Sequence, residues 1–167
     1  RETEVIMRAL AEFFGEDKEK WGIVGLLHDI DWDKTKEDTK NHTIKAKDIL
    51  SEAGASQFLI DAVVSHTYGN QECGENPERE RSTRLEHSLA AAETVTGLIV
   101  AAALMQSDKK VSSVKLSSLK KKYKDKRFAA NCDRDIIREI EQTGLTLDEF
   151  FDLSLKALTD ISDELQL

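Results

Sequence analysis

The stretch Trp21–Asp33, which reads WGIVGLLHDIDWD, decides how the rest of the chain is interpreted. It begins with apolar residues that suit a buried helix and changes abruptly at the adjacent pair His28 and Asp29. Neighbouring residues on a helix point about 100° apart, so one cation above the gap can contact both side chains. Imidazole and carboxylate are ligands for zinc, iron, manganese and magnesium. The pair predicts a metal site; the alternative is a helix end whose His and Asp face water.

The composition is that of a globular chain rich in helix-forming residues. Of its 167 residues, 40% are hydrophobic, 34% are charged and one is proline, which indicates an all-α fold with a sizeable core. The formal net charge of −8 disfavours non-specific binding to nucleic acid. The longest apolar run, 97–105, is less than half of the roughly twenty residues that a bilayer requires. Cys73 and Cys132 show neither metal-type spacing nor a disulfide framework, which suits the cytoplasm.

Apolar residues recur at helical spacing along most of the chain. Helices are expected over these segments: 4–14, 21–29, 42–53, 57–65, 85–105, 133–142 and 146–165. The polar stretches 33–40, 67–84 and 108–118 are expected to be connections. The result is a predicted all-α, compact bundle of about seven helices.

The segment Gly25–Asp31, GLLHDID, resembles the signature of the HD superfamily of metal-dependent phosphohydrolases. Further segments resemble a bacterial branch of predicted HD hydrolases: 7–17, 97–104 and 120–129. The resemblance reaches about Ile137. It implies an HD-domain helical bundle, with 1–167 as a single HD-type domain whose helices in 133–167 form a C-terminal extension. That extension is expected to cover the bundle or a dimer partner.

The resemblance also implies which residues hold the metal. His28 and Asp29 are expected as ligands, and Asp29 also as a catalytic group that orients water or bridges two ions. The family's last ligand is an Asp in an Ala-Ala-Asp sequence. Here that place reads Ala91-Ala92-Glu93, so Glu93, one methylene longer, is the expected ligand. The family's first ligand, a His on the first helix, would fall about two places before Arg1.

Three other histidines complete the set of candidates. The resemblance implies that His42 binds a second ion and that His66 is a catalytic group, either as a ligand or by holding phosphate. The alternative for His42 is a residue at a helix start that faces water. The alternative for His66 is a residue that interacts favourably with the dipole at a helix C-terminus and has no catalytic role. Asp31 lies three residues after His28 and is either a partner of the site or a solvated loop acid. His87 lies about 120° from Glu93 around a helix and is therefore interpreted as a surface residue.

Residues 120–127 include six basic residues out of eight. The resemblance suggests that Lys121, Lys122 and Lys124 contact substrate phosphate, where positive charge neutralises an anion. The alternative is a solvated face. Tyr123 is the one aromatic residue within the run, which argues against a nucleic-acid surface.

Two functions follow as expectations. The first is hydrolysis of a phosphomonoester, often a nucleotide in this family, by water activated on a divalent Mn, Fe, Zn, Mg or Ni ion. The expected partner is a small-molecule phosphoester substrate. Binding to a membrane is not expected, binding to nucleic acid is disfavoured, and a homodimer is one option. The second is a degenerate HD-fold module that binds or regulates without catalysis. The Glu in place of the family's Asp motivates this alternative.

Overall fold

The computed structural model describes residues 1–74 and 76–162, and all regular structure within them is helical. The predicted all-α helical bundle is confirmed. The α-helices are α1 Glu2–Phe14, α2 Lys18–Leu27, α3 Trp32–Thr35, α4 Ile44–Glu52, α5 Gln57–Val64, α6 Arg84–Leu104, α7 Leu116–Lys124, α8 Arg134–Arg138 and α9 Leu147–Asp160. The 3-10 turns are η1 Thr39–Asn41, η2 Ser65–Thr67, η3 Val111–Ser113 and η4 Glu139–Thr143.

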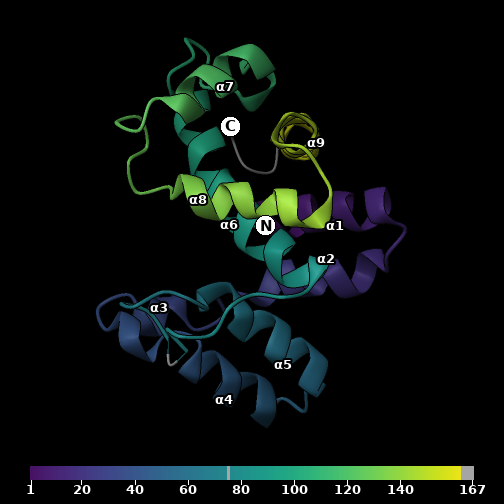
Figure 1. Cartoon of the computed structure of the whole chain (residues 1–167), viewed down its shortest axis with the longest axis vertical. Helices are drawn as coiled ribbons and strands as arrows, with labels where there is room; N and C mark the ends of the chain where they lie inside the picture. Colours follow the sequence, from purple (N-terminus) through teal and green to yellow (C-terminus); the bar gives the residue numbers. More distant parts are fainter. Residues whose placement is uncertain (75, 163–167) are drawn as a thin grey trace.

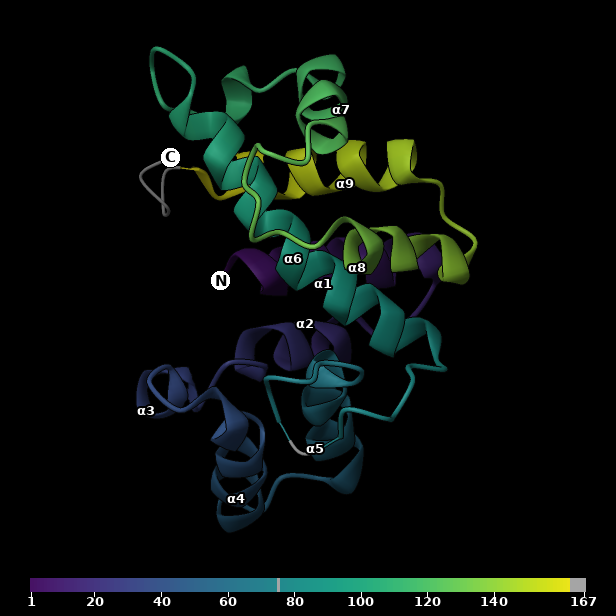
Figure 2. The same ribbon diagram turned by 60° about the vertical axis from the view of Figure 1, so that its left-hand side comes forward.

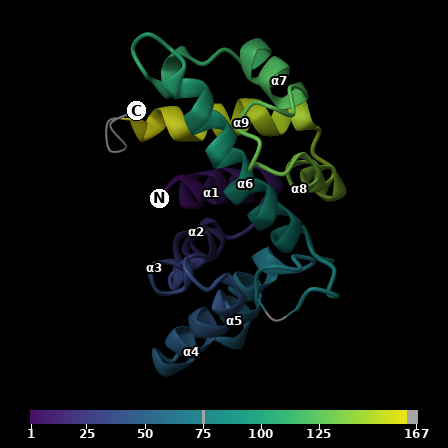
Figure 3. The same cartoon turned by 90° about the vertical axis from the view of Figure 1, so that its left-hand side faces the viewer.

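The helices gather into two groups, with α2 lying between them (Figures 1 and 2). Helices α1, α6 and α9 bury the larger core, in which Leu10, Leu98 and Phe150 are fully buried. Helices α4 and α5 bury a smaller cluster around Leu50 and Val63. Figure 3 shows α4 and α5 at one end of the molecule and α7 and α9 at the other. The boundary between the two groups is where the candidate site lies.

Helix α2 joins the two groups because its apolar residues serve both. Trp21 and Val24 pack into the larger core, whereas Leu27 packs against the smaller cluster. Asp17 caps the helix by accepting hydrogen bonds from the backbone N–H groups of Glu19 and Lys20. The chain therefore leaves α2 at the boundary, directly before His28 and Asp29.

Glycine permits α2 to lie very close to α1. A Cβ built on Gly25 would lie 2.9 Å from the carbonyl oxygen of Thr3 and 3.0 Å from the Cα of Glu4. Backbone atoms cannot rotate away as a side chain can, so only glycine fits this contact. The close approach brings the start of α1 alongside the end of α2.

Helix α6 is the central core helix. Its N-terminus is closed by a capping box between Thr83 and Glu86. Within the described residues it is the one helix long and apolar enough to cross a membrane, with a mean hydropathy of 1.4. However, 56% of that apolar window is buried inside the fold, as is usual for a core helix.

Several element boundaries differ from the sequence-based expectations. Helix α2 begins earlier than residue 21, at the Asp17 cap, and ends at Leu27, so His28 and Asp29 follow the helix. The short helix α3 and helix α7 fall in segments expected to be partly or wholly loop. Helix α7 forms because Leu119 and Tyr123 are buried on one face, a pattern that its lysines obscure. Helix α9 ends at Asp160; the last part of its predicted range, 163–165, lies outside the described residues.

Candidate metal centre

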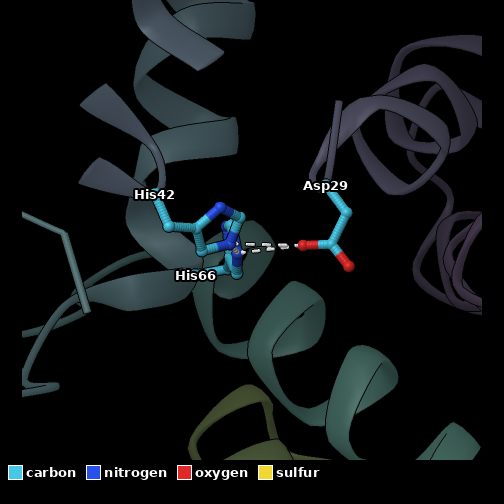
Figure 4. A group of neighbouring side chains, drawn as sticks. All are labelled: Asp29, His42 and His66. Atoms are coloured by element: carbon cyan, nitrogen blue, oxygen red, sulfur yellow. Dashed lines mark hydrogen bonds and ion pairs between the residues drawn. The ribbon is translucent and has the colours of Figure 1, made fainter. Parts of the chain in front are cut away.

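Asp29, His42 and His66 come together from three separate segments (Figure 4). One ligand atom from each lies within 4.8 Å of the other two. Asp29 Oδ1 is 3.3 Å from His42 Nε2 and 3.6 Å from His66 Nε2. His28 Nε2 lies 3.4 Å from the other oxygen, Oδ2, of the same carboxylate. The carboxylate of Asp29 is thus surrounded by the Nε2 atoms of three histidines.

Asp31 fixes the orientation of His42. This aspartate is fully buried, and its Oδ1 accepts a hydrogen bond of 2.8 Å from His42 Nδ1. Its Oδ2 accepts bonds from the backbone N–H groups of Thr43 and Ala46, at 2.9 and 3.1 Å. Thr43 has a φ of 65°, an uncommon conformation for a residue with a side chain. The start of α4 is therefore built around the Asp31 carboxylate.

The other two imidazoles are oriented by backbone carbonyls. His28 Nδ1 donates to the carbonyl of Gly25 at 2.9 Å, and His66 Nδ1 donates to the carbonyl of Val63 at 2.6 Å. A carbonyl only accepts, so the neutral ring carries its proton on Nδ1 and a lone pair on Nε2. The same holds for His42, whose Nδ1 donates to the carboxylate of Asp31. All three Nε2 atoms are thereby prepared as metal ligands, as in known His-metal sites.

The spacing of these ligand atoms suits one cation. His42 Nε2 and His66 Nε2 are 3.0 Å apart, and both carry lone pairs when the rings are neutral. Two lone pairs at this distance repel unless a proton or a cation lies between them. Two nitrogens bound at about 2.1 Å to one ion, at a right angle, are about 3.0 Å apart. The donor set of two or three imidazoles and a carboxylate therefore fits a divalent transition metal.

Burial and mutual contact shift the pKa values of the group. Burial lowers the pKa of His66 to about 3 and also lowers that of His28. Burial opposes ionisation of Asp29, but hydrogen bonding to His42 and the nearby imidazoles hold its pKa at about 2. Burial likewise opposes protonation of His42, but Asp29 and Asp31 on either side raise its pKa. The site thus favours neutral His28 and His66 beside an ionised Asp29, the forms that ligate metal.

Glu93 on α6 lines the same cavity as Asp29. It is not in the close group formed by Asp29 and the two histidines. Burial, with a smaller contribution from the charge of Asp29, raises the pKa of Glu93 to about 7. A nearby cation would stabilise the ionised form of Glu93 and oppose this rise in its pKa.

The cavity at the site has a volume of about 910 Å³ and extends from the histidines along α6. Four carboxylates line it: Glu2, Asp29, Glu93 and Asp133. Arg1 is the one lysine or arginine among the described residues that line it. Leu26, Ile30 and Trp32 present exposed apolar surface to it. The cavity is therefore acidic near the site and apolar along one wall.

The structure does not bring the basic candidates to this cavity. Lys121, Lys122 and Lys124 lie on α7 and do not line it. The ammonium group of Lys122 lies 4.1 Å from the ring centre of Phe128, which is a packing contact. The expectation that these lysines hold substrate phosphate at the metal centre therefore has no support in their positions.

Other candidates lie elsewhere than expected. His87 is not a plain surface residue: its side chain is 15% exposed, and Nδ1 lies 2.8 Å from Glu139 Oε2. Cys73 and Cys132 both line the cavity. Burial and the nearby Glu93 raise the pKa of the Cys73 thiol to about 11, which disfavours the thiolate form that binds metals. The sequence gives no sign that Cys73 and Cys132 lie in the same cavity, because they are 59 residues apart.

Two residues support the site: Asp31 was a candidate from the sequence, and Arg81 was not. The sequence allowed two interpretations of Asp31, a partner of the site or a solvated loop acid. In the structure it accepts a hydrogen bond from His42. Arg81 lies in the polar stretch 67–84, which the sequence predicts to be a connection. Its side chain is only 7% exposed and contacts the backbone around His66. A long polar loop gives no periodic signal, so only the fold reveals this contact.

Helical architecture together with a His/Asp cluster defines the class: an all-α protein with a candidate divalent-metal site. The HD domain family model matches residues 1–103, well over half of the chain. The chain belongs to the HD domain family, whose members are generally metal-dependent phosphohydrolases. The match confirms the resemblance carried by the segment around His28 and Asp29. Searches among curated proteins and among solved structures found no match.

Proposed function

We propose that this protein is a metal-dependent phosphohydrolase that acts on a phosphomonoester. The observation that carries the proposal is the convergence of His42 Nε2, His66 Nε2 and Asp29 Oδ1, with each imidazole held by its own Nδ1 bond. Rings fixed in this way need no rearrangement when a metal binds. Membership of the HD domain family supports the same reaction class.

The residues divide into those that hold the metal and those that act around it. Asp29, His42 and His66 would hold the ion, and His28 and Glu93, which line the same cavity, would be further ligands. A bound divalent metal lowers the pKa of a coordinated water and polarises a phosphoryl oxygen. Asp29, with its low pKa, stays ionised at neutral pH and would offer a hydrogen-bond acceptor to that water. Asp31 stabilises the positive charge that His42 shares with a bound cation.

The charge of the cavity limits the substrate. Its four carboxylates repel anions, and it offers few basic groups to balance them. A single phosphoryl group can be neutralised at the metal, whereas further phosphates would lie among carboxylates, with Arg1 as the one lysine or arginine among the described lining residues. The apolar wall formed by Leu26, Ile30 and Trp32 suits an uncharged ring. We therefore propose a monophosphate with an uncharged remainder, such as a nucleoside monophosphate or an aryl phosphate.

The test is phosphate release from para-nitrophenyl phosphate by the full chain loaded with Mn²⁺. Turnover that requires the metal and is lost in His42→Ala supports the proposal. His87→Gln is the matched control, because it replaces a histidine that lies outside the metal group with an amide that can still donate to Glu139. Turnover that persists after metal removal contradicts the proposal.

The alternative is a non-catalytic HD module. Glu93 favours it, since it stands where the family has Asp and lies outside the close ligand group. A protein that binds stoichiometric metal but releases no phosphate from monophosphate esters would support this alternative over hydrolysis.

A further inference from the structure

Arg81, in the loop before α6, has a buried side chain that hydrogen-bonds to the backbone of the turn carrying His66. Arg81 Nη1 donates towards three carbonyl oxygens, those of Ser65, His66 and Tyr68, at 3.3, 3.2 and 2.7 Å. These three residues span η2, the turn that presents His66, and the residue after it. A short 3-10 turn has few internal bonds to hold it in place. The arginine therefore adds three contacts to those that hold this backbone.

Glu139 holds the arginine in turn. Arg81 Nε and Nη2 donate to the two oxygens of Glu139 at 2.7 and 2.5 Å, a bidentate pair. The same carboxylate also accepts a hydrogen bond of 2.8 Å from His87 Nδ1. Glu139 opens η4, where the adjacent side chain of Ile140 is fully buried in the larger core. The carboxylate thus rests on a firmly anchored segment.

The family match ends at residue 103, so Glu139 lies outside it. We propose that Glu139 and Arg81 form a clamp that positions His66 for metal binding, so that the C-terminal helices take part in the metal centre. Arg81 is a positioning residue because it touches the backbone of the ligand and lies outside the ligand group. The proposal rests on the metal site of the proposed function.

A planar arginine fork is required for this geometry. Two of its nitrogens engage the carboxylate while the third faces the carbonyls, and a lysine has one nitrogen for both tasks. Arg81→Lys keeps the charge and removes the geometry. Glu139→Gln keeps the shape and removes the charge that holds the arginine. Ile140→Val is the control: it trims a buried methyl group beside Glu139 and lowers the melting temperature, but leaves the clamp intact.

Two measurements on the full chain test the clamp: the dissociation constant for Mn²⁺, and the ring ¹⁵N signals of His66 in the metal-free protein. We expect Arg81→Lys and Glu139→Gln to weaken Mn²⁺ binding roughly 10- to 100-fold, as loss of outer partners does in other metal sites. We also expect both variants to shift the His66 signals. Ile140→Val should leave both readouts at wild-type values.

The proposal is overturned if Arg81→Lys and Glu139→Gln behave like Ile140→Val in the ring signals. It is equally overturned if Ile140→Val weakens Mn²⁺ binding as much as they do, because general destabilisation then explains the loss. A wild-type protein that binds no Mn²⁺ overturns the proposed function instead. The ring signals still decide on the clamp in that case, since they are recorded without metal.

Discussion

At the scale of single residues, Asp31 shows how one buried carboxylate organises the centre. It accepts three hydrogen bonds, from His42 Nδ1 and from the backbone N–H groups of Thr43 and Ala46. Each donor would be left without a partner if the carboxylate were lost. Asp31 therefore sets both the start of α4 and the direction in which His42 points.

Asp31→Asn should weaken metal binding and folding together. The amide has one oxygen in place of two and turns a donor towards a donor, so at least one buried bond is lost. We expect metal affinity to fall roughly 10- to 100-fold and the free energy of unfolding to fall by about 1–3 kcal/mol. Mn²⁺ titration and urea unfolding measure the two effects. Wild-type affinity in Asp31→Asn would show that His42 does not depend on this bond.

The ion pair of Arg81 and Glu139 makes the free energy of unfolding depend on pH. Burial opposes ionisation of Glu139, but the hydrogen bonds from Arg81 and His87 outweigh it and lower its pKa below the ordinary value of 4.5. Its stabilising effect is therefore complete above about pH 4.5 and is lost as the pH falls through the lower folded-state pKa.

We expect the difference in unfolding free energy between wild type and Glu139→Gln to be constant near neutral pH and to shrink in acid. Urea unfolding of both proteins at a series of pH values measures this difference. A difference that stays the same down to pH 3 would mean that the charge of Glu139 does not contribute to stability.

At the scale of elements, the contact between α1 and α2 depends on Gly25. Gly25→Ala would place a Cβ against backbone atoms of Thr3 and Glu4. In Gly22→Ala, by contrast, the new Cβ meets only atoms of the long side chain of Arg8, which can rotate as backbone atoms cannot. We expect Gly25→Ala to destabilise the fold by about 1–3 kcal/mol and Gly22→Ala to cost less. Denaturant unfolding compares the two; equal stability would contradict the close approach.

The elements also show what the sequence could predict. Amphipathic spacing revealed α1 and α9, which bury clear apolar faces, and a long stretch that is apolar nearly all round revealed α6. Helix α7 was missed because its lysines hide a face of only two buried residues, Leu119 and Tyr123. Helix α3 is a single turn, too short to show a period.

The candidate site was predictable only as a list of residues. The resemblance pointed to His28, Asp29, His42, His66 and Glu93, and these line one cavity. Their roles as ligands or catalytic groups stay predictions. The contacts that Asp31 and Arg81 make could not be found from spacing, since their partners lie 11 and up to 58 residues away in sequence. Such long-range contacts are created by tertiary packing, which no local pattern records.

At the scale of the whole molecule, the acidic cavity makes a prediction about substrate charge. With the same nucleoside, the monophosphate should be hydrolysed with a higher kcat/KM than the diphosphate, and the triphosphate should be the poorest. Each added phosphate brings negative charge among the carboxylates that line the cavity. Phosphate release at fixed free Mn²⁺ concentration measures the series. A triphosphate preferred over the monophosphate would contradict this account of the cavity.

The central claim is that imidazoles and a carboxylate from separate segments hold one divalent cation. Metal stoichiometry tests it most directly, by elemental analysis of the full chain after loading with Mn²⁺ and desalting. We predict stoichiometric metal in wild type and in His87→Gln, and loss of metal in His42→Ala, His66→Ala and Asp29→Asn. A wild-type chain without metal, or three site variants that retain it in full, would contradict the account.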